Sequence, residues 1–241
     1  MGVFLLLYLV SFAVTLAGGP GARWMWTTSL YLVVQGVLTF LILVHLTRTA
    51  RAILITSLLF FCCLIVEFVG VTFSVPFGPH YFSYFLQPFV AGNVPLAILC
   101  IWYILVVNAY LVLRAISTPR LNGFRLLLAV AVFVAALDVL LEPFAAFING
   151  YWKWIDGVVP IRNYVTWFLL ALLFAAVLHR WSAWRVPEIA PTHARMPGLV
   201  LGLNALQFTA VNLLHGHVLA TAVAWAIMGV TLAGARGRLR L

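Results

Sequence analysis

The acidic residues of this 241-residue chain are few, and their spacing indicates that three of them act together. Glu67 lies about 15 residues into one long apolar run, and Asp138 lies about 14 residues into another. If both runs are helices that start from the same side of a membrane, a rise of 1.5 Å per residue places the two carboxyl groups at one depth, roughly 21–22 Å along. Glu142 follows one helical turn after Asp138 and projects from the same helix face. We therefore predict one acid–base site made by Glu67, Asp138 and Glu142, with Asp156 in the loop above it.

An ionisable group inside a spanning helix costs at least about 2.5 kcal/mol, so its presence is a functional hypothesis by default. The competing interpretation is that Glu67 and Asp138 are neutral acids that share a structural hydrogen bond between helices. Apolar surroundings favour the protonated form of a carboxyl group, and a second carboxyl nearby strengthens that preference. One group could then donate a proton while its partner stays ionised. The fifth acid, Glu188, lies among arginines in a loop and is interpreted as a solvated surface charge.

No motif for a nucleotide, a redox cofactor or a metal accompanies these acids in the sequence. The single lysine, Lys153, falls in a loop, which excludes a retinal Schiff base within a helix bundle. His215 and His217 are two residues apart, which is a weak metal signal and more typical of a turn. The three cysteines lie inside apolar runs without metal-ligand spacing. We expect no cofactor and no metal.

Aromatic residues make up 15% of the chain, including 18 Phe and 9 Trp. Rings around an acidic site stabilise a carbocation through cation–π interaction. A proton donor, an aromatic lining and access to lipid together suit protonation of an isoprenoid double bond, which gives a tertiary carbocation. The cation can then be captured by water, be captured by an internal alkene, or lose a proton elsewhere.

The elements that must position these residues are membrane helices. The chain is 65% hydrophobic and 8% charged, with a mean hydropathy of +1.13, which excludes a soluble enzyme and a disordered chain. A spanning helix needs roughly 20 apolar residues. We predict an all-α integral membrane protein, one transmembrane domain over residues 1–241 with about eight helices (seven possible). The apolar runs are 2–17, 27–46, 52–74, 90–113, 124–148, 163–182, 197–214 and 218–235. The first run lacks a basic segment before it, which favours a short retained helix over a cleaved signal peptide.

The distribution of Lys and Arg between the loops predicts how the chain is oriented in the membrane. Eleven of the 14 Lys and Arg residues fall in one set of alternate loops, which predicts that both termini are cytoplasmic and that the protein crosses the cell membrane several times. The net charge of +9 is attributed to contact with anionic lipid headgroups, and no nucleic-acid partner is expected.

Loops 75–89 and 149–162 are rich in Gly, Pro and aromatic residues, so we expect them to fold over the site. An ordinary belt of interfacial aromatics is the alternative for the individual rings.

Two stretches within positions 67–167 resemble the membrane carotenoid-biosynthesis proteins of the bisanhydrobacterioruberin hydratase or γ-carotene 1,2-hydratase type. The first stretch holds Glu67-Phe-Val-Gly70, Phe77-Gly78, Tyr81, Tyr84, Pro88, Asn93-Val94-Pro95 and Trp102. The second holds Asp138, Glu142-Pro143, Trp152, Trp154, Gly157, Pro160, Asn163 and Trp167. The chain departs from the family at Asn93, where a Gly is common, and at Glu142, where an Asp is common. The resemblance implies addition of water to the terminal C1=C2 double bond of an acyclic carotenoid end, which gives a tertiary alcohol.

The leading hypothesis is therefore a cofactor-independent carotenoid hydratase whose partners are an isoprenoid lipid substrate, water and membrane lipids. Asp138 or Glu67 would donate the proton, and the other carboxyl group, helped by Glu142, would position and deprotonate the water. Asn93 and Asn163, at the predicted starts of their helices, would hold that water. The candidate substrate-binding residues are Tyr81, Tyr84, Asn93, Trp102, Trp152, Trp154, Asp156, Asn163 and Trp167. A membrane carotenoid or terpene cyclase that uses the same acids is the alternative, followed by a proton-coupled carrier.

Overall fold

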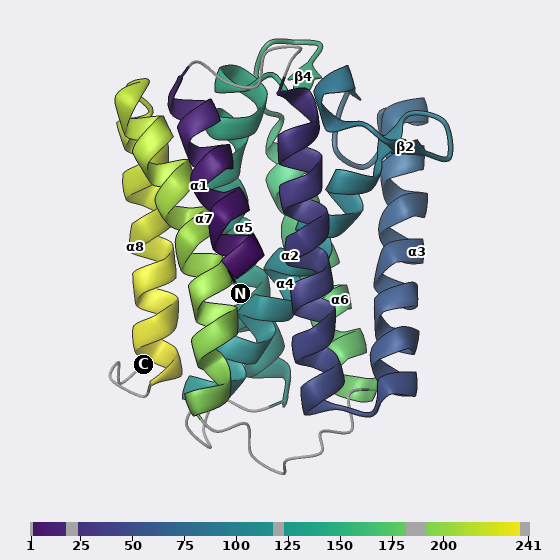
Figure 1. The fold of residues 1–241 in the computed structure, drawn as a ribbon, viewed down its shortest axis with the longest axis vertical. Coiled ribbons are helices and arrows are strands. Elements are labelled where there is room, and N and C mark those ends of the chain that lie inside the picture. The colour runs from purple at the N-terminus through teal and green to yellow at the C-terminus, as the bar shows by residue number, and fades with distance from the viewer. Residues whose placement is uncertain (1, 18–23, 118–122, 182–190, 237–241) are drawn as a thin grey trace.

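The structure, a computed structural model, describes residues 2–17, 24–117, 123–181 and 191–236. Within these ranges the chain forms a bundle of eight α-helices with two small sheets at one end (Figure 1). The helices are α1 (Gly2–Leu16), α2 (Met25–Leu46), α3 (Thr49–Phe73), α4 (Leu96–Ile116), α5 (Gly123–Glu142), α6 (Ile161–Trp181), α7 (Arg195–Leu214) and α8 (Val218–Ala235). The strands are β1 (His80–Phe82), β2 (Phe89–Val90), β3 (Val94–Pro95) and β4 (Trp152–Trp154). Short helical turns lie at η1 (Tyr84–Leu86), η2 (Pro143–Ile148) and η3 (Pro191–Ala194).

Seven of the described helices are long and apolar enough to cross a membrane, and α1 is a shorter apolar helix. In Figure 1, α1 begins about halfway up the bundle. The predicted all-α membrane bundle is confirmed. Its eight described helices are the seven long ones and the short helix α1. The fourth helix begins at Leu96 rather than at 90, because residues 89–95 form the hairpin β2–β3. Glu188, interpreted above as a surface charge, lies outside the described residues.

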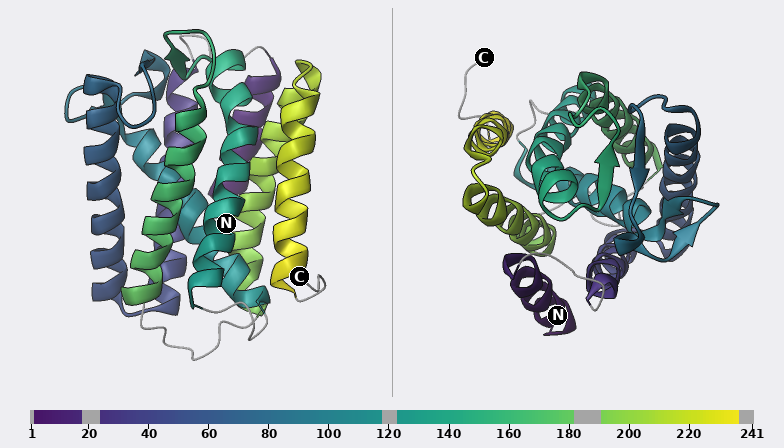
Figure 2. Two further views of the ribbon diagram at one scale, coloured as in Figure 1. Left: turned by 180° about the vertical axis from the view of Figure 1, so that it is seen from behind. Right: turned by 90° about the horizontal axis from the view of Figure 1, so that it is seen from above.

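Helix α4 passes between the other helices and packs against α2, α3, α5, α6 and α7 (Figure 2). Its side chains are buried along almost the whole length, including the aromatic residues Trp102 and Tyr103. A helix that is apolar on every face suits either lipid or the centre of a bundle, and the packing of α4 against five other helices places it at the centre. This central position brings Trp102 within reach of α3 on one side and α6 on the other.

The two aromatic loops are joined by a sheet into one cap, here defined as residues 75–89 and 149–160. Strand β1 pairs with β4 in antiparallel register, so that His80 lies opposite Trp154 and Phe82 opposite Trp152. Side chains alternate between the two faces of a strand. His80, Trp152 and Trp154 are buried on the inner face, whereas Tyr81 points outward. As expected, residues of both loops fold over the acids, and Trp152 and Trp154 hydrogen-bond to Glu142.

Candidate active site

Beneath the cap lies a small cavity of about 30 Å³, which is room for a water molecule or a small group. Ligand sites are mostly apolar with a few polar groups. The lining of this cavity has that character, because aromatic rings make up most of its wall and two carboxylic acids open into it. Its lining residues are Glu67, Phe77, His80, Phe82, Ile98, Ile101, Trp102, Glu142, Trp152, Trp154, Asn163 and Trp167.

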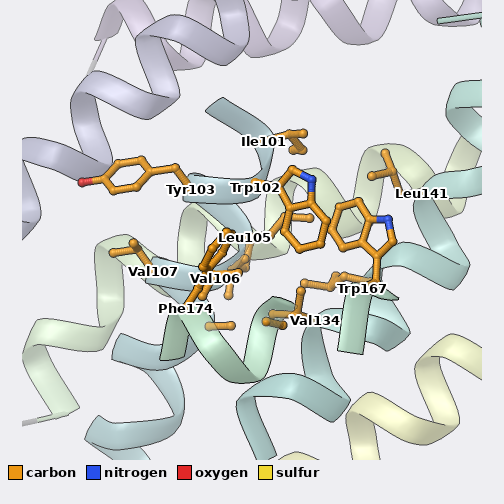
Figure 3. Close-up of a cluster of buried hydrophobic side chains, with 14 of the residues drawn as sticks. Ile101, Trp102, Tyr103, Leu105, Val106, Val107, Val134, Leu141, Trp167 and Phe174 are labelled. Carbon is orange, nitrogen blue, oxygen red and sulfur yellow. The ribbon is translucent and has the colours of Figure 1, made fainter. Parts of the chain in front are cut away.

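Glu67 reaches the cavity from α3 and is held there by one hydrogen bond. Its Oε1 accepts the indole N–H of Trp102 at 2.8 Å. The Trp102 ring stacks on Trp167 with centroids 3.7 Å apart and planes 16° from parallel, and Phe174 meets it edge-on (Figure 3). This packing fixes the indole and therefore the carboxyl group. Glu67 Oε2 makes no hydrogen bond within the described part of the chain, so it is the oxygen left for a molecule in the cavity.

Glu142 enters from the end of α5 and accepts three N–H bonds. Its Oε2 receives the indole N–H groups of Trp154 at 3.0 Å and Trp152 at 3.2 Å, and its Oε1 receives Asn163 Nδ2 at 2.9 Å. The π-helical turn η2 follows directly, starting at Pro143, and such turns are frequent at functional sites. The chain then folds back, and Tyr151 N–H bonds to the carbonyl of Ala145 at 2.8 Å. This return places both tryptophans over the acid that precedes the turn.

Asp138 lies behind this layer and is not part of the cavity wall. Its side chain is fully buried, and its Oδ2 accepts the second N–H of Asn163 Nδ2 at 3.0 Å. The other oxygen, Oδ1, has no hydrogen-bond partner among the residues that the structure describes. Asn163 thus joins Asp138 to Glu142. The sequence placed Glu67 and Asp138 at one depth as the pair that faces the substrate, but the geometry brings Glu67 and Glu142 to the cavity and leaves Asp138 one layer away.

His80, which the sequence reading did not select, also lines the cavity. Its Nδ1 lies 2.8 Å from the carbonyl oxygen of Gly78. Burial lowers the pKa of the imidazole from its ordinary value, and the hydrogen bond to Gly78 offsets part of that change. One sequence signal could have identified His80. In "HYF" and "WKW" aromatic rings occupy alternate positions, which is the pattern of two strands that turn rings to one shared face.

The predicted substrate-binding residues divide into two groups. Trp102, Trp152, Trp154, Asn163 and Trp167 all line the cavity. Tyr81, Tyr84, Asn93 and Asp156 are exposed and lie away from it. Tyr81 faces outward because it alternates with His80 and Phe82 on the strand, and Asn93 lies in the exposed turn of the β2–β3 hairpin rather than at a helix start. Asn163 is the amide that reaches the carboxyl groups.

A second cavity, of about 40 Å³, adjoins the first. The two share Ile98, Ile101 and Trp152 as a common wall. The second cavity is otherwise lined mainly by residues of α1, α2, α5, η2 and α7. Tyr151 also contributes, and burial raises the pKa of its hydroxyl to about 12, with a hydrogen bond to Thr28 acting in the opposite direction. Its lining thus carries no charged group at neutral pH.

Among the residues that the structure describes, no group of three or more His, Cys, Asp and Glu side chains is arranged to hold a metal ion. The groups on the cavity that can act chemically are two carboxyl groups, one imidazole and the aromatic rings.

The chain resembles a known protein family over most of its length. The family model of carotenoid biosynthesis proteins matches residues 27–231. A bisanhydrobacterioruberin hydratase from Haloarcula japonica is 35% identical over 109 residues, which is 43% of this chain and 36% of that relative. The aligned region therefore spans little more than a third of the relative's length. No solved structure matches the chain. Because the family match covers most of the sequence, the chain belongs to the carotenoid biosynthesis protein family.

Proposed function

We propose that the protein adds water to the terminal double bond of an acyclic carotenoid end, by protonating the alkene and capturing the resulting tertiary cation. The observation that carries this proposal is the meeting of Glu67 and Glu142 on one aromatic-lined cavity at the capped end of the bundle. The family match and the name of the hydratase relative support a carotenoid as the substrate. Seven helices fit to span a membrane support a substrate that arrives from the lipid.

Glu67 is the proton donor in this proposal. Oε1 is engaged by the Trp102 indole, which leaves Oε2 to carry the proton toward the alkene. A positioned general acid must lie within hydrogen-bond reach of its target, and the stacked Trp102–Trp167 pair holds the carboxyl group still while the substrate end enters.

Glu142 and the rings stabilise the cation that follows. Indole and phenyl faces attract a positive charge, and the effect is larger where water is excluded. The charge of Glu142, fixed by its three N–H donors, faces the same space. Preorganised groups of this kind lower the barrier because they need no rearrangement as charge develops. Asp138 acts through Asn163 as a positioning residue rather than as the donor.

In this proposal the second cavity widens to take the part of the isoprenoid chain next to the reacting end, because its volume of about 40 Å³ is too small for the whole chain. It meets the first at Ile98, Ile101 and Trp152, so a chain whose end lies beside Glu67 can continue past that wall. Movement of the Trp152 ring or the two isoleucines would join the cavities. The uncharged lining suits a hydrocarbon.

The test is pigment analysis of a host that accumulates an acyclic carotenoid, with and without the gene. Hydration predicts a product heavier by one water per reacted end. A product of unchanged mass with a new ring would instead assign a cyclase that uses the same acids. Unchanged pigments, with the protein present in the membrane, would rule out both reactions for that substrate class.

A further inference from the structure

We propose that His80 is the base that takes the proton from the attacking water, and that Glu67 and His80 therefore divide the reaction into two proton transfers. The inference rests on the proposed hydration and deepens it. It is carried by the geometry of the imidazole at the cavity wall.

The hydrogen bond to Gly78 fixes which ring nitrogen can act as a base. A carbonyl oxygen only accepts hydrogen bonds, so the contact at 2.8 Å requires the hydrogen on Nδ1 of His80. In the neutral ring Nε2 then carries the lone pair. Nε2 makes no hydrogen bond within the described part of the chain. Burial, which lowers the pKa of His80, keeps the ring neutral near pH 7.

The surroundings hold the ring in place without competing for Nε2. Phe77 and Phe82 contact the imidazole edge-on, and Trp154 lies with its centroid 5.1 Å away. Gly70 of α3 leaves the space that the Phe77 ring occupies beside the imidazole, because a Cβ there would lie 2.7 Å from a Phe77 ring carbon. The ionisable side chains near this arrangement are Glu67 and Glu142 on the cavity, Lys153 on the outer face of β4, and Arg162 beside Gly78.

His80 lines the cavity, and its Nε2 is an acceptor that no described group occupies. Glu142 already accepts N–H bonds on both oxygens, and Glu67 Oε2 has just given its proton to the alkene. In the proposed step the water oxygen bonds to the cationic carbon while its O–H proton moves to Nε2. The alkene has then gained one proton from Glu67 and one hydroxide equivalent from water. Return of the proton from His80 to Glu67 across the cavity completes addition of one water and resets the site.

Reaction in D₂O separates the two transfers. Protonation of the alkene without water capture is reversible, because the cation can lose a proton and return to an alkene, so it leaves deuterium in recovered substrate. For His80→Phe, which keeps an aromatic ring but has no Nε2, we expect alcohol formation to fall about 10²–10⁴-fold while deuterium still enters the recovered carotenoid. Imidazole added to His80→Ala should restore part of the alcohol yield.

Each other outcome overturns the inference. Alcohol at near wild-type rate from His80→Phe means that another group takes the proton. Loss of both alcohol and deuterium exchange means that His80 supports the donor or the fold and is not a separate base. Failure of the proposed hydration looks different, since the wild-type protein itself would then yield no alcohol from any acyclic end.

Discussion

Replacing Glu67 by Gln tests the proton donor with little other change to the cavity. The amide oxygen of Gln can still accept the Trp102 indole N–H that Glu67 accepts at 2.8 Å, so the stacked pair with Trp167 should remain. Only the transferable proton is lost. General acids typically contribute 10²–10⁴-fold, which corresponds to roughly 3–5 kcal/mol of activation free energy. We expect alcohol formation to fall by that factor, with carotenoid still bound and the folded amount unchanged or higher, since a buried ionisable group has been removed.

The assay measures alcohol per unit of membrane-inserted protein and records bound pigment separately. Asp138→Asn is the matched comparison, because Asp138 is as deeply buried but lies behind the cavity wall. Its loss should be smaller, about tenfold, through the position of Asn163 and Glu142. Near-full turnover by Glu67→Gln, or an equal loss in both variants, would refute the assignment of Glu67 as the donor.

The remaining predictions address the packing, the imidazole and the second cavity. Gly70→Ala should lower the free energy of unfolding by about 1–3 kcal/mol, because its Cβ would lie 2.7 Å from Phe77; thermal unfolding compares it with Gly202→Ala, whose Cβ meets nothing within 4 Å. Burial lowers the pKa of His80 from its ordinary value of 6.5. As the pH falls through 6.5, the unfolded chain therefore binds more protons than the folded one, and the free energy of unfolding decreases. The unfolding midpoint should therefore drop further between pH 7 and pH 5 for wild type than for His80→Phe, and equal drops would contradict this. Ala145→Leu fills part of the second cavity and should reduce kcat/KM for a long acyclic carotenoid more than for a short acyclic terpene with the same end group. A uniform reduction across chain lengths would remove the second cavity from substrate binding.

The helical part of the fold could be predicted from the sequence because its cause is local. Runs of about 20 apolar residues broken by Arg, Gly and Pro predict spanning helices, and α2, α3, α6, α7 and α8 begin and end within a few residues of those runs. The start of α4 was placed too early, because Val90, Ala91 and Val94 continue the apolar run back into the hairpin. A two-residue strand pair with Gly92 at φ +82 in its turn leaves almost no periodic signal.

The site was predicted in its residue types but only in part in its geometry. Depth along a helix, which paired Glu67 with Asp138, does not say which way a side chain points around the axis. Glu142 faces the cavity because η2 and the return of the chain to β4 bring two indoles to it, and this is a tertiary arrangement. His80 was overlooked because its place depends on the pairing of β1 with β4, which are about 70 residues apart in the sequence.

The most direct test of the central claim is a reaction in isotopically labelled water. Purified protein in liposomes would be given an acyclic carotenoid in water enriched in heavy oxygen, and the products would be analysed by mass spectrometry. We predict a tertiary alcohol that carries the heavy oxygen from the wild-type protein, and none above background from Glu67→Gln. A cyclic product without added oxygen, or labelled alcohol from both proteins at equal rates, would contradict the account.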